Sequence, residues 1–200
     1  MKSNIHLIED VGAAILLSKL RNQSLNPSMV RHYVREMTAA LTRYVLQRPE
    51  EGERVAVIII LRSGLSMAEE FMDAFENTDD TVAFHLGLFR EKESLRPIEY
   101  YNKLPAKDPE IKRAYVLDPV VATGGTATAA IDILKDWGVE HITFFSLLGS
   151  KQGLDRVSKV WPEGTDIFIG AIDDVLDAEG YVQPGLGDIG DRLYGTNRAR

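Results

Sequence analysis

The segment that decides the fold reads Tyr115-Val-Leu-Asp-Pro-Val-Val-Ala-Thr-Gly-Gly-Thr126. An apolar, strand-like run ends at the single carboxylate of Asp118, and a turn rich in hydroxyls and glycine follows it. Apolar residues at helical spacing begin directly afterwards, over Ala127–Trp137. A strand, a glycine turn and a helix together present free backbone N–H groups and a positive helix end to a phosphate. The segment therefore predicts a phosphate-binding turn within an α/β fold.

The side chains of this turn suit a phosphorylated sugar. Its glycines permit close approach of the backbone, and Thr123 and Thr126 supply hydroxyl donors. An ionised Asp118 only accepts hydrogen bonds, which suits sugar hydroxyls or a metal-bound water. The alternative is a plain strand-to-helix connection in which Thr126 caps the helix. The turn has neither the Gly-Lys-Ser/Thr of a Walker loop nor the G-x-G-x-x-G spacing of a dinucleotide site.

Outside this turn, strand-like and helix-like segments alternate, which predicts a doubly wound parallel sheet. The 200 residues of the chain suit one domain. We expect N-terminal helices in 1–50, a core sheet in 54–172 and a hood and tail without a long element in 173–200. The expected strands are Arg54–Leu61, Thr81–Phe89, Ile98–Leu104, Arg113–Leu117, His141–Leu148 and Thr165–Ile172, and the expected helices are Leu7–Leu20, Pro27–Gln47, Gly64–Phe75, Ala127–Trp137 and Lys151–Val160.

The composition narrows the classes of function. A net charge of −7 argues against a general nucleic-acid surface. The sequence has no cysteine, which excludes disulfides, thiolate zinc sites and a cysteine nucleophile. Acids near the start and only short apolar runs favour a cytoplasmic protein without a membrane segment. The acidic cluster of Asp173, Asp174 and Asp177 is expected on a solvated face.

Four segments without a core pattern follow strands or strand-like runs. Ligands of doubly wound sheets bind beyond the carboxyl ends of the strands, near a change in strand order. We therefore expect these segments to converge on one crevice. They are Leu61–Leu65, the polar excursion Arg90–Arg96, the turn Asp118–Thr126, and Tyr181–Gly190.

The segment Asp118–Thr126 resembles the phosphoribosyl-diphosphate loop of type I phosphoribosyltransferases. Most members carry two adjacent acids before the turn, whereas one Asp followed by proline and Ala-Thr-Gly-Gly is the variant of the uracil phosphoribosyltransferases. Three further segments resemble that family in order and spacing: its diphosphate loop, its mobile loop, and its uracil-binding hood with the tail. They are Ile60–Met67, Phe89–Pro105 and Gly180–Thr196.

This resemblance implies a type I phosphoribosyltransferase fold with N-terminal helices, a mobile β-hairpin loop and a C-terminal hood. It also implies transfer of ribose 5-phosphate from phosphoribosyl diphosphate to uracil N1 in pyrimidine salvage, giving UMP and diphosphate. Mg²⁺ would be bound mainly through the phosphoribosyl diphosphate, with no direct side-chain ligand assigned. A homodimer or higher homo-oligomer is expected, with the N-terminal helices within Leu7–Gln47 as a candidate interface. Regulation by GTP, as in some relatives, is left open.

The resemblance also assigns roles residue by residue. Arg62, Arg90, Asp118 and Asp188 form the implied catalytic set: the arginines serve the diphosphate, Asp118 the ribose hydroxyls, and Asp188 the ribose or a metal. The uracil site is implied at Val182, Gly187, Asp188 and Ile189, through main-chain groups. The implied phosphoribosyl-diphosphate site consists of Arg62, Arg90, Asp118, Pro119, Val120, Val121, Ala122, Thr123, Gly124, Gly125, Thr126 and Asp188.

Four positions depart from the family pattern. Ser63 and Ser66 replace the usual Ala and Gly of the diphosphate loop, and Thr126 replaces the usual Ser. Ile189 stands where Ala or Phe is usual beside the uracil. These departures leave open an alternative function, that of a catalytically weak ligand sensor or regulator built on the same fold.

Overall fold

The fold centres on a seven-stranded sheet of order β1-β9-β7-β5-β2-β3-β4. The computed structural model describes residues 3–46, 54–75, 80–91 and 97–196. Neighbouring strands are parallel except for the antiparallel pair β3 and β4, which confirms the predicted mostly parallel sheet. The strands are β1 (Ile5–Leu7), β2 (Arg54–Leu61), β3 (Thr81–Arg90), β4 (Pro97–Asn102), β5 (Ile111–Leu117), β7 (His141–Ser146) and β9 (Thr165–Ile169).

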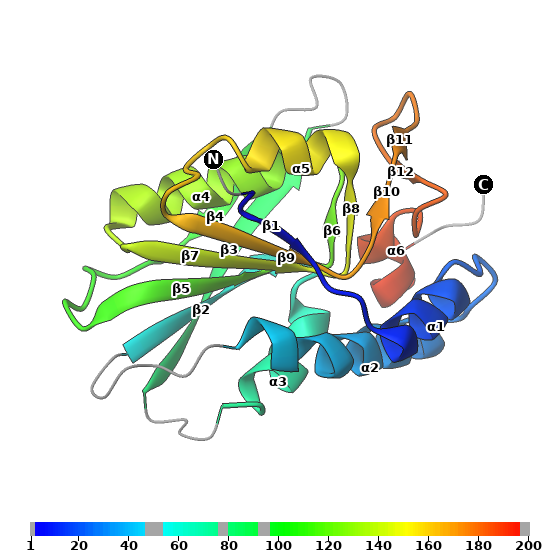
Figure 1. Cartoon of the computed structure of the whole chain (residues 1–200), viewed down its shortest axis with the longest axis horizontal. Helices are drawn as coiled ribbons and strands as arrows, with labels where there is room; N and C mark the ends of the chain where they lie inside the picture. Colours follow the sequence, from blue (N-terminus) through cyan, green and yellow to red (C-terminus); the bar gives the residue numbers. More distant parts are fainter. Residues whose placement is uncertain (1–2, 47–53, 76–79, 92–96, 197–200) are drawn as a thin grey trace.

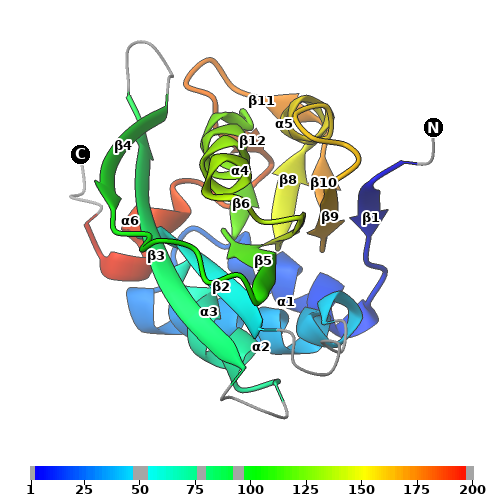
Figure 2. The ribbon, with the colours of Figure 1, turned by 90° about the vertical axis from the view of Figure 1, so that its left-hand side faces the viewer.

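Helices cover both faces of this sheet (Figures 1 and 2). The buried run of β2 sends Val55, Val57 and Ile59 into one core, and the residues between them into the other. A strand buried on both faces needs such a continuous apolar run, which is why β2 was recognisable from sequence. One face carries α1 (Val11–Leu20), α2 (Pro27–Val45) and α3 (Leu65–Met72), and the other carries α4 (Gly125–Trp137) and α5 (Lys151–Val157).

The start of the chain differs from the prediction. The expected helix Leu7–Leu20 begins only at Val11, because the Asp10 side chain accepts a hydrogen bond from the Ala13 N–H and caps the helix there. Residues Ile5–Leu7 instead pair with β9 and form an edge strand. Three other expected helices extend too far: α2 ends at Val45, while α3 and α5 have the shorter bounds given above.

A second, three-stranded sheet lies beside the carboxyl ends of the main strands, in the order β10-β8-β6. Two of the expected strands are therefore interrupted, and each contributes to both sheets. The expected strand His141–Leu148 breaks at Leu147, and Thr165–Ile172 breaks at Gly170. The N–H groups of Leu147 and Leu148 both donate to the Pro119 carbonyl, so the chain bends toward the glycine turn. The strands are β6 (Val120–Val121), β8 (Leu148–Ser150) and β10 (Ile172–Asp173).

The tail contains the short strands β11 (Val175–Leu176) and β12 (Val182–Gln183) and the helix α6 (Ile189–Tyr194). Helix α6 was not expected from the sequence; the Asp188 side chain caps it by accepting from the Asp191 N–H at 3.0 Å. In Figure 1 this segment lies against α1 and α2. Asp173 does not belong to a solvated face as expected, since it is 10% exposed and paired with Arg21.

The expected hairpin is present as the pair β3 and β4. Residues 92–96, the central part of the predicted mobile loop Phe89–Pro105, lie outside the described residues. In the part of the chain that the structure describes, no helix is both long and apolar enough to cross a membrane.

Candidate active site

Two adjoining hollows, of about 290 Å³ and about 530 Å³, open at the carboxyl ends of β2, β3 and β5. Both are lined by residues of the turn after β5 and of the tail before α6. The structure thus brings the turn Asp118–Thr126 and the hood residues Gly187–Ile189 together, as expected from the topology of the sheet. The residues common to both hollows are Phe89, Asp118, Val120, Thr126, Asp188 and Ile189.

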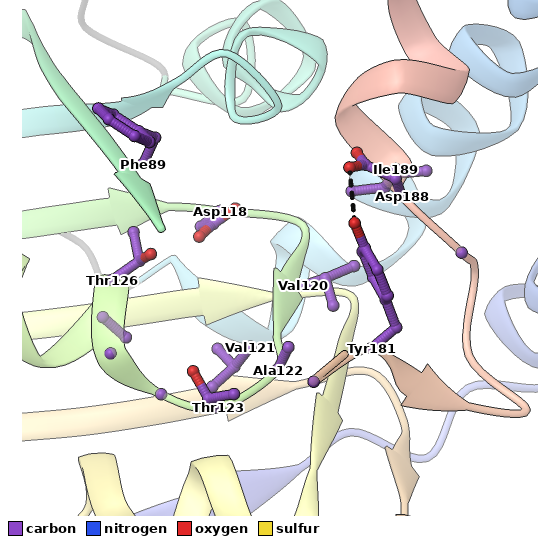
Figure 3. Close-up of a pocket in the computed structure, with 15 residues that line it drawn as sticks. Phe89, Asp118, Val120, Val121, Ala122, Thr123, Thr126, Tyr181, Asp188 and Ile189 are labelled. Atoms are coloured by element: carbon purple, nitrogen blue, oxygen red, sulfur yellow. Dashed lines mark hydrogen bonds between the residues drawn. The ribbon is translucent and has the colours of Figure 1, made fainter. Parts of the chain in front are cut away.

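The glycine turn opens directly into α4, a helix of 13 residues. Gly124, not Thr126, occupies the N-cap position, in a left-handed conformation with φ of 76° that favours glycine. Thr126 lies inside the first turn, and Figure 3 shows its side chain on the same hollow as Asp118. Free N–H groups and the positive helix end therefore face the hollow, which is the arrangement that binds a phosphate.

Helix α5 supports this turn from behind. The Ser150 hydroxyl donates to the Ala122 carbonyl at 2.6 Å and also accepts from the Gly153 N–H. A Cβ on Gly153 would lie 2.1 Å from the same carbonyl, so only glycine permits the contact. The position of the turn is thus set by α5 as well as by its own sequence.

Asp118 lies between the two hollows and is only 7% exposed. Burial raises the pKa of its carboxyl to about 7, and hydrogen bonds from the Ser63 hydroxyl and the Val120 N–H oppose part of that rise. Ser63 donates from its Oγ to the Asp118 Oδ1 at 3.1 Å. The ionised carboxylate is a hydrogen-bond acceptor suited to the hydroxyls of a sugar.

Arg62 lines the second hollow from the end of β2. Its guanidinium donates to the Asp191 carboxylate at 2.9 Å, and half of the side chain is exposed. Next to it, a Cβ on Gly64 would lie 2.4 Å from the Leu117 carbonyl, so this turn also needs glycine. The buried guanidinium of Arg192 donates to the Leu186 carbonyl at 2.6 Å.

The hood borders the first hollow with Gly187, Asp188 and Ile189. Figure 3 shows Tyr181 reaching toward Asp188, and the hydroxyl donates to the Oδ2 of that carboxylate at 3.3 Å. Gly187 has a φ of 67°, which favours glycine, and it lines the first hollow. Planar bases that carry both carbonyl and N–H groups can be recognised by such main-chain donors and acceptors.

Three further residues of the implied site are Pro119, Val182 and Arg90. Within the described part of the chain, Pro119 and Val182 line neither hollow. The Pro119 carbonyl accepts hydrogen bonds at the small sheet, and the side chain of Val182, within the hood segment, is buried in the core. Arg90 ends β3, where it pairs with Pro97, and its side chain lies outside the described structure.

The sequence-based assignment missed two aromatic residues at the site. Phe89 borders both hollows, and Tyr100 lines the second one. Their rings lie 5.9 Å apart and tilted, on opposite arms of the β3–β4 hairpin. An aromatic residue at the end of an expected strand carries little signal by itself. The alternation of Phe89 with the buried Leu88 was the available hint.

The acidic residues fit a magnesium ion bound mainly through a phosphorylated substrate. Asp118 and Asp188 both border the two hollows, and carboxylate oxygens are ligands that Mg²⁺ prefers. No group of three or more metal-ligating side chains gathers anywhere in residues 3–46, 54–75, 80–91 and 97–196. A Mg²⁺ ion at this site would therefore need oxygen atoms supplied by the substrate and water.

Comparisons with known proteins agree with this geometry. The chain is 41% identical over 162 residues to the uracil phosphoribosyltransferase of Lachnoclostridium phytofermentans, covering 81% of this chain and 75% of that protein. It is 38% identical to that of Roseiflexus sp., covering 90% and 92%. Among solved structures, the AQ2163 protein of Aquifex aeolicus superposes with a TM-score of 0.84 at 26% identity, covering 95% of this chain and 97% of that one.

A more distant structure shows the fold alone. Adenine phosphoribosyltransferase of Leishmania donovani has a TM-score of 0.59 at 10% identity, covering 90% of this chain and 88% of its own. The family model for uracil phosphoribosyltransferase matches residues 46–196, which include the glycine turn, the diphosphate-loop segment and the hood. On this match and these relatives, the chain belongs to the uracil phosphoribosyltransferase family.

Proposed function

We propose that this protein transfers ribose 5-phosphate from phosphoribosyl diphosphate to N1 of uracil, releasing UMP and diphosphate. The observation that carries the proposal is the meeting of the glycine turn and the glycine-rich hood around two joined hollows. One part suits a phosphorylated sugar, and the other suits a planar base. The bond from C1 to the diphosphate oxygen breaks, the bond from C1 to N1 forms, and the N1 proton is released.

The turn after β5 anchors the 5-phosphate in this proposal. Backbone N–H groups at the start of α4 donate to the phosphate oxygens, and the hydroxyls of Thr123 and Thr126 add two donors. Asp118, at the junction of the hollows, accepts hydrogen bonds from the ribose hydroxyls. The sugar is thereby held with C1 toward the hood. Holding C1 close to the base in this way accelerates the reaction.

The leaving diphosphate develops negative charge as its bond to C1 breaks. Arg62 lines the second hollow and offers an exposed guanidinium, which can bind two diphosphate oxygens at once. To do so, it must exchange its hydrogen bond with Asp191 for the ligand. Arg90 has the same proposed role from the end of β3. Asp118 and Asp188, together with oxygens of the substrate, would hold a Mg²⁺ ion, which would supply further positive charge to the diphosphate.

Uracil is read by the main chain of the hood in this proposal. Gly187 and Ile189 border the first hollow and offer N–H and carbonyl groups, while Asp188 faces the ribose side. Val182 supports the hood from the buried side. The Ile189 side chain packs against the flat face of the base.

The departures at Ser63 and Ser66 fit within this site. Ser66 lies in the first turn of α3, where a residue with a side chain is accommodated, and its hydroxyl donates to the Ser63 carbonyl at 2.7 Å. Ser63 itself donates to Asp118. Both hydroxyls therefore have partners, and neither observation favours a sensor over an enzyme.

The test is a turnover assay with radiolabelled uracil, excess phosphoribosyl diphosphate and Mg²⁺. Many moles of labelled UMP per mole of protein are expected. Tight binding of uracil and phosphoribosyl diphosphate with less than one turnover would instead support the sensor. Adenine and hypoxanthine serve as control bases and should give no nucleotide.

We also propose a cytoplasmic homo-oligomer acting in pyrimidine salvage. Support for an interface comes from α1, whose outward residues Val11 and Ile15 are 80% and 54% exposed. Light scattering of the protein, with Val11→Glu as the comparison, tests this point. Regulation by GTP remains a prediction, which assays with and without the nucleotide would decide.

A further inference from the structure

If uracil is recognised by main-chain groups, the backbone of the hood must keep one conformation. Gly185 has a φ of 52°, and a Cβ there would lie 1.8 Å from the Val182 carbonyl. Gly187 is also left-handed. Because glycine loses the most freedom on folding, this segment needs external contacts to keep one shape. The question is which side chains provide them.

The first contact is an ion pair beneath Gly185. Arg21, at the C-terminal end of α1, donates through two nitrogens to the two oxygens of Asp173, at 2.8 Å and 2.9 Å. Arg21 also donates to the Gly185 carbonyl at 3.1 Å, and Asp173 accepts from the Gly185 N–H at 3.0 Å. The carbonyl and N–H of one hood residue are thus held by both partners of one ion pair.

This ion pair is partly shielded from water. The side chains of Arg21 and Asp173 are 27% and 10% exposed. Burial tends to raise the pKa of Asp173, but the hydrogen bonds from Arg21 and the Gly185 N–H outweigh it and leave that pKa below its usual value. A fork-shaped guanidinium on a carboxylate has a defined geometry, which makes the contact a rigid support.

Two further contacts join the same region of the chain to the hood. Arg192 is 5% exposed and bridges the Leu186 carbonyl, at 2.6 Å, to the Asn22 carbonyl, at 2.8 Å. A Cβ on Gly187 would lie 3.0 Å from the Gln23 side chain, so the turn after α1 packs closely on the hood. Residues 21–23 therefore hold the hood at consecutive positions, although they lie outside the matched region 46–196.

We infer that Arg21 is a positioning residue for the base: through Asp173 and Gly185 it fixes the hood backbone that reads uracil, without lining the cavity itself. This inference rests on the proposed function, since it assigns the base-reading role to the hood. Because the hydrogen bonds to the base come from main-chain groups, selection of the base depends on the contacts that hold this main chain.

The test compares two probes, UMP and ribose 5-phosphate, by titration calorimetry. Ribose 5-phosphate engages the turn after β5 but has no base. In Arg21→Ala, we expect UMP to bind about tenfold more weakly and ribose 5-phosphate to bind within about twofold of the wild type. Arg21→Lys keeps the positive charge but not the forked guanidinium, so its affinity for UMP should lie between those of the wild type and Arg21→Ala. Arg35→Ala removes another ion pair of the helical layer, to Glu70 at 2.8 Å, and should change neither affinity.

Equal weakening of both probes in a folded Arg21→Ala protein, or unchanged UMP affinity, would overturn the inference. Asp173→Asn keeps the side-chain shape if Arg21→Ala does not fold, and the same selective loss is expected. Hydrogen exchange of the amides of 185–189 should be faster in both variants. Wild-type protein from the same preparation is assayed for UMP formation. An inactive wild type would refute the proposed function, whereas an active wild type with unaltered variants would refute only the role of Arg21.

Discussion

The Ser63 hydroxyl donates a hydrogen bond to the Asp118 carboxylate, with Oγ and Oδ1 3.1 Å apart. The two residues come from different strand ends, 55 positions apart in the sequence. Ser63 stands where the family usually has alanine, so this chain adds a donor to a carboxylate whose pKa burial raises to about 7. A donor to the ionised form opposes that rise.

Replacing this serine should therefore change the pH dependence of the reaction. Ser63→Ala removes the donor, so the pKa of Asp118 rises further and the acid limb of kcat/KM for phosphoribosyl diphosphate moves to higher pH. The measurement is a pH–rate profile of the free enzyme. Ser66→Ala is the matched control, because that hydroxyl donates to the Ser63 carbonyl instead. Coincident profiles for Ser63→Ala and wild type would exclude this role.

Replacing Asp118 by asparagine should raise the stability of the protein and lower its activity. Its folded pKa of about 7 lies above its unfolded value, so between these values the folded state holds more protons. Stability is thus lost as the pH rises toward 7, and the loss is complete above it. Asp118→Asn cannot ionise and should be more stable than wild type at pH 8, by about 1 kcal/mol or more.

This difference should disappear near pH 3, below the ordinary pKa of 3.8, where Asp118 is neutral in both the folded and the unfolded state. Denaturant unfolding at the two pH values measures it. In the same variant kcat should fall by about a hundredfold or more, because the acceptor for the ribose hydroxyls loses its charge. A variant that is less stable at pH 8, or as active as wild type, would contradict the assignment.

Helix α5 should control phosphate binding from behind the site. Gly153→Ala places a methyl group 2.1 Å from the Ala122 carbonyl, so the turn must move. We expect KM for phosphoribosyl diphosphate to rise about tenfold, with a much smaller effect on KM for uracil. Steady-state kinetics with each substrate varied decide this. Gly12→Ala, on the exposed side of α1, is the control and should alter neither constant.

Arg62 should act on one substrate only. Arg62→Gln removes a charged donor to the diphosphate, so KM for phosphoribosyl diphosphate should rise about tenfold or more. Uracil, which has no diphosphate, should keep its KM. Arg43→Gln breaks the ion pair to Asp10, at 2.7 Å, away from both hollows, and is the control. A rise in both constants by the same factor would argue for a general loss of structure.

Much of the fold was predictable because it depends on local patterns. The continuous apolar run of β2 has to be buried on both faces, and the glycine turn has to separate β5 from α4. The same patterns placed Asp118, Thr126 and Asp188 at carboxyl ends of strands or in a polar tail. Topology then requires those ends to meet.

The parts that were missed depend on distant contacts. The sheet formed by β6, β8 and β10 has strands of two or three residues, which are too short for a periodic pattern. Helix α6 has six residues, and its cap is shown only by the Asp188 geometry. The contact between Gly153 and Ala122, and the ion pair of Arg21 with Asp173, join segments that no sequence window contains together.

The most direct test of the account is the stoichiometry of the reaction catalysed by the wild type and by Asp118→Asn. Uracil, phosphoribosyl diphosphate and Mg²⁺ are supplied in excess, and UMP and diphosphate are quantified over time. We predict equal amounts of both products, continuous turnover in the wild type, and a rate lower by about a hundredfold or more in the variant. Absence of UMP from the folded wild-type protein, or diphosphate release that does not depend on uracil, would contradict the account.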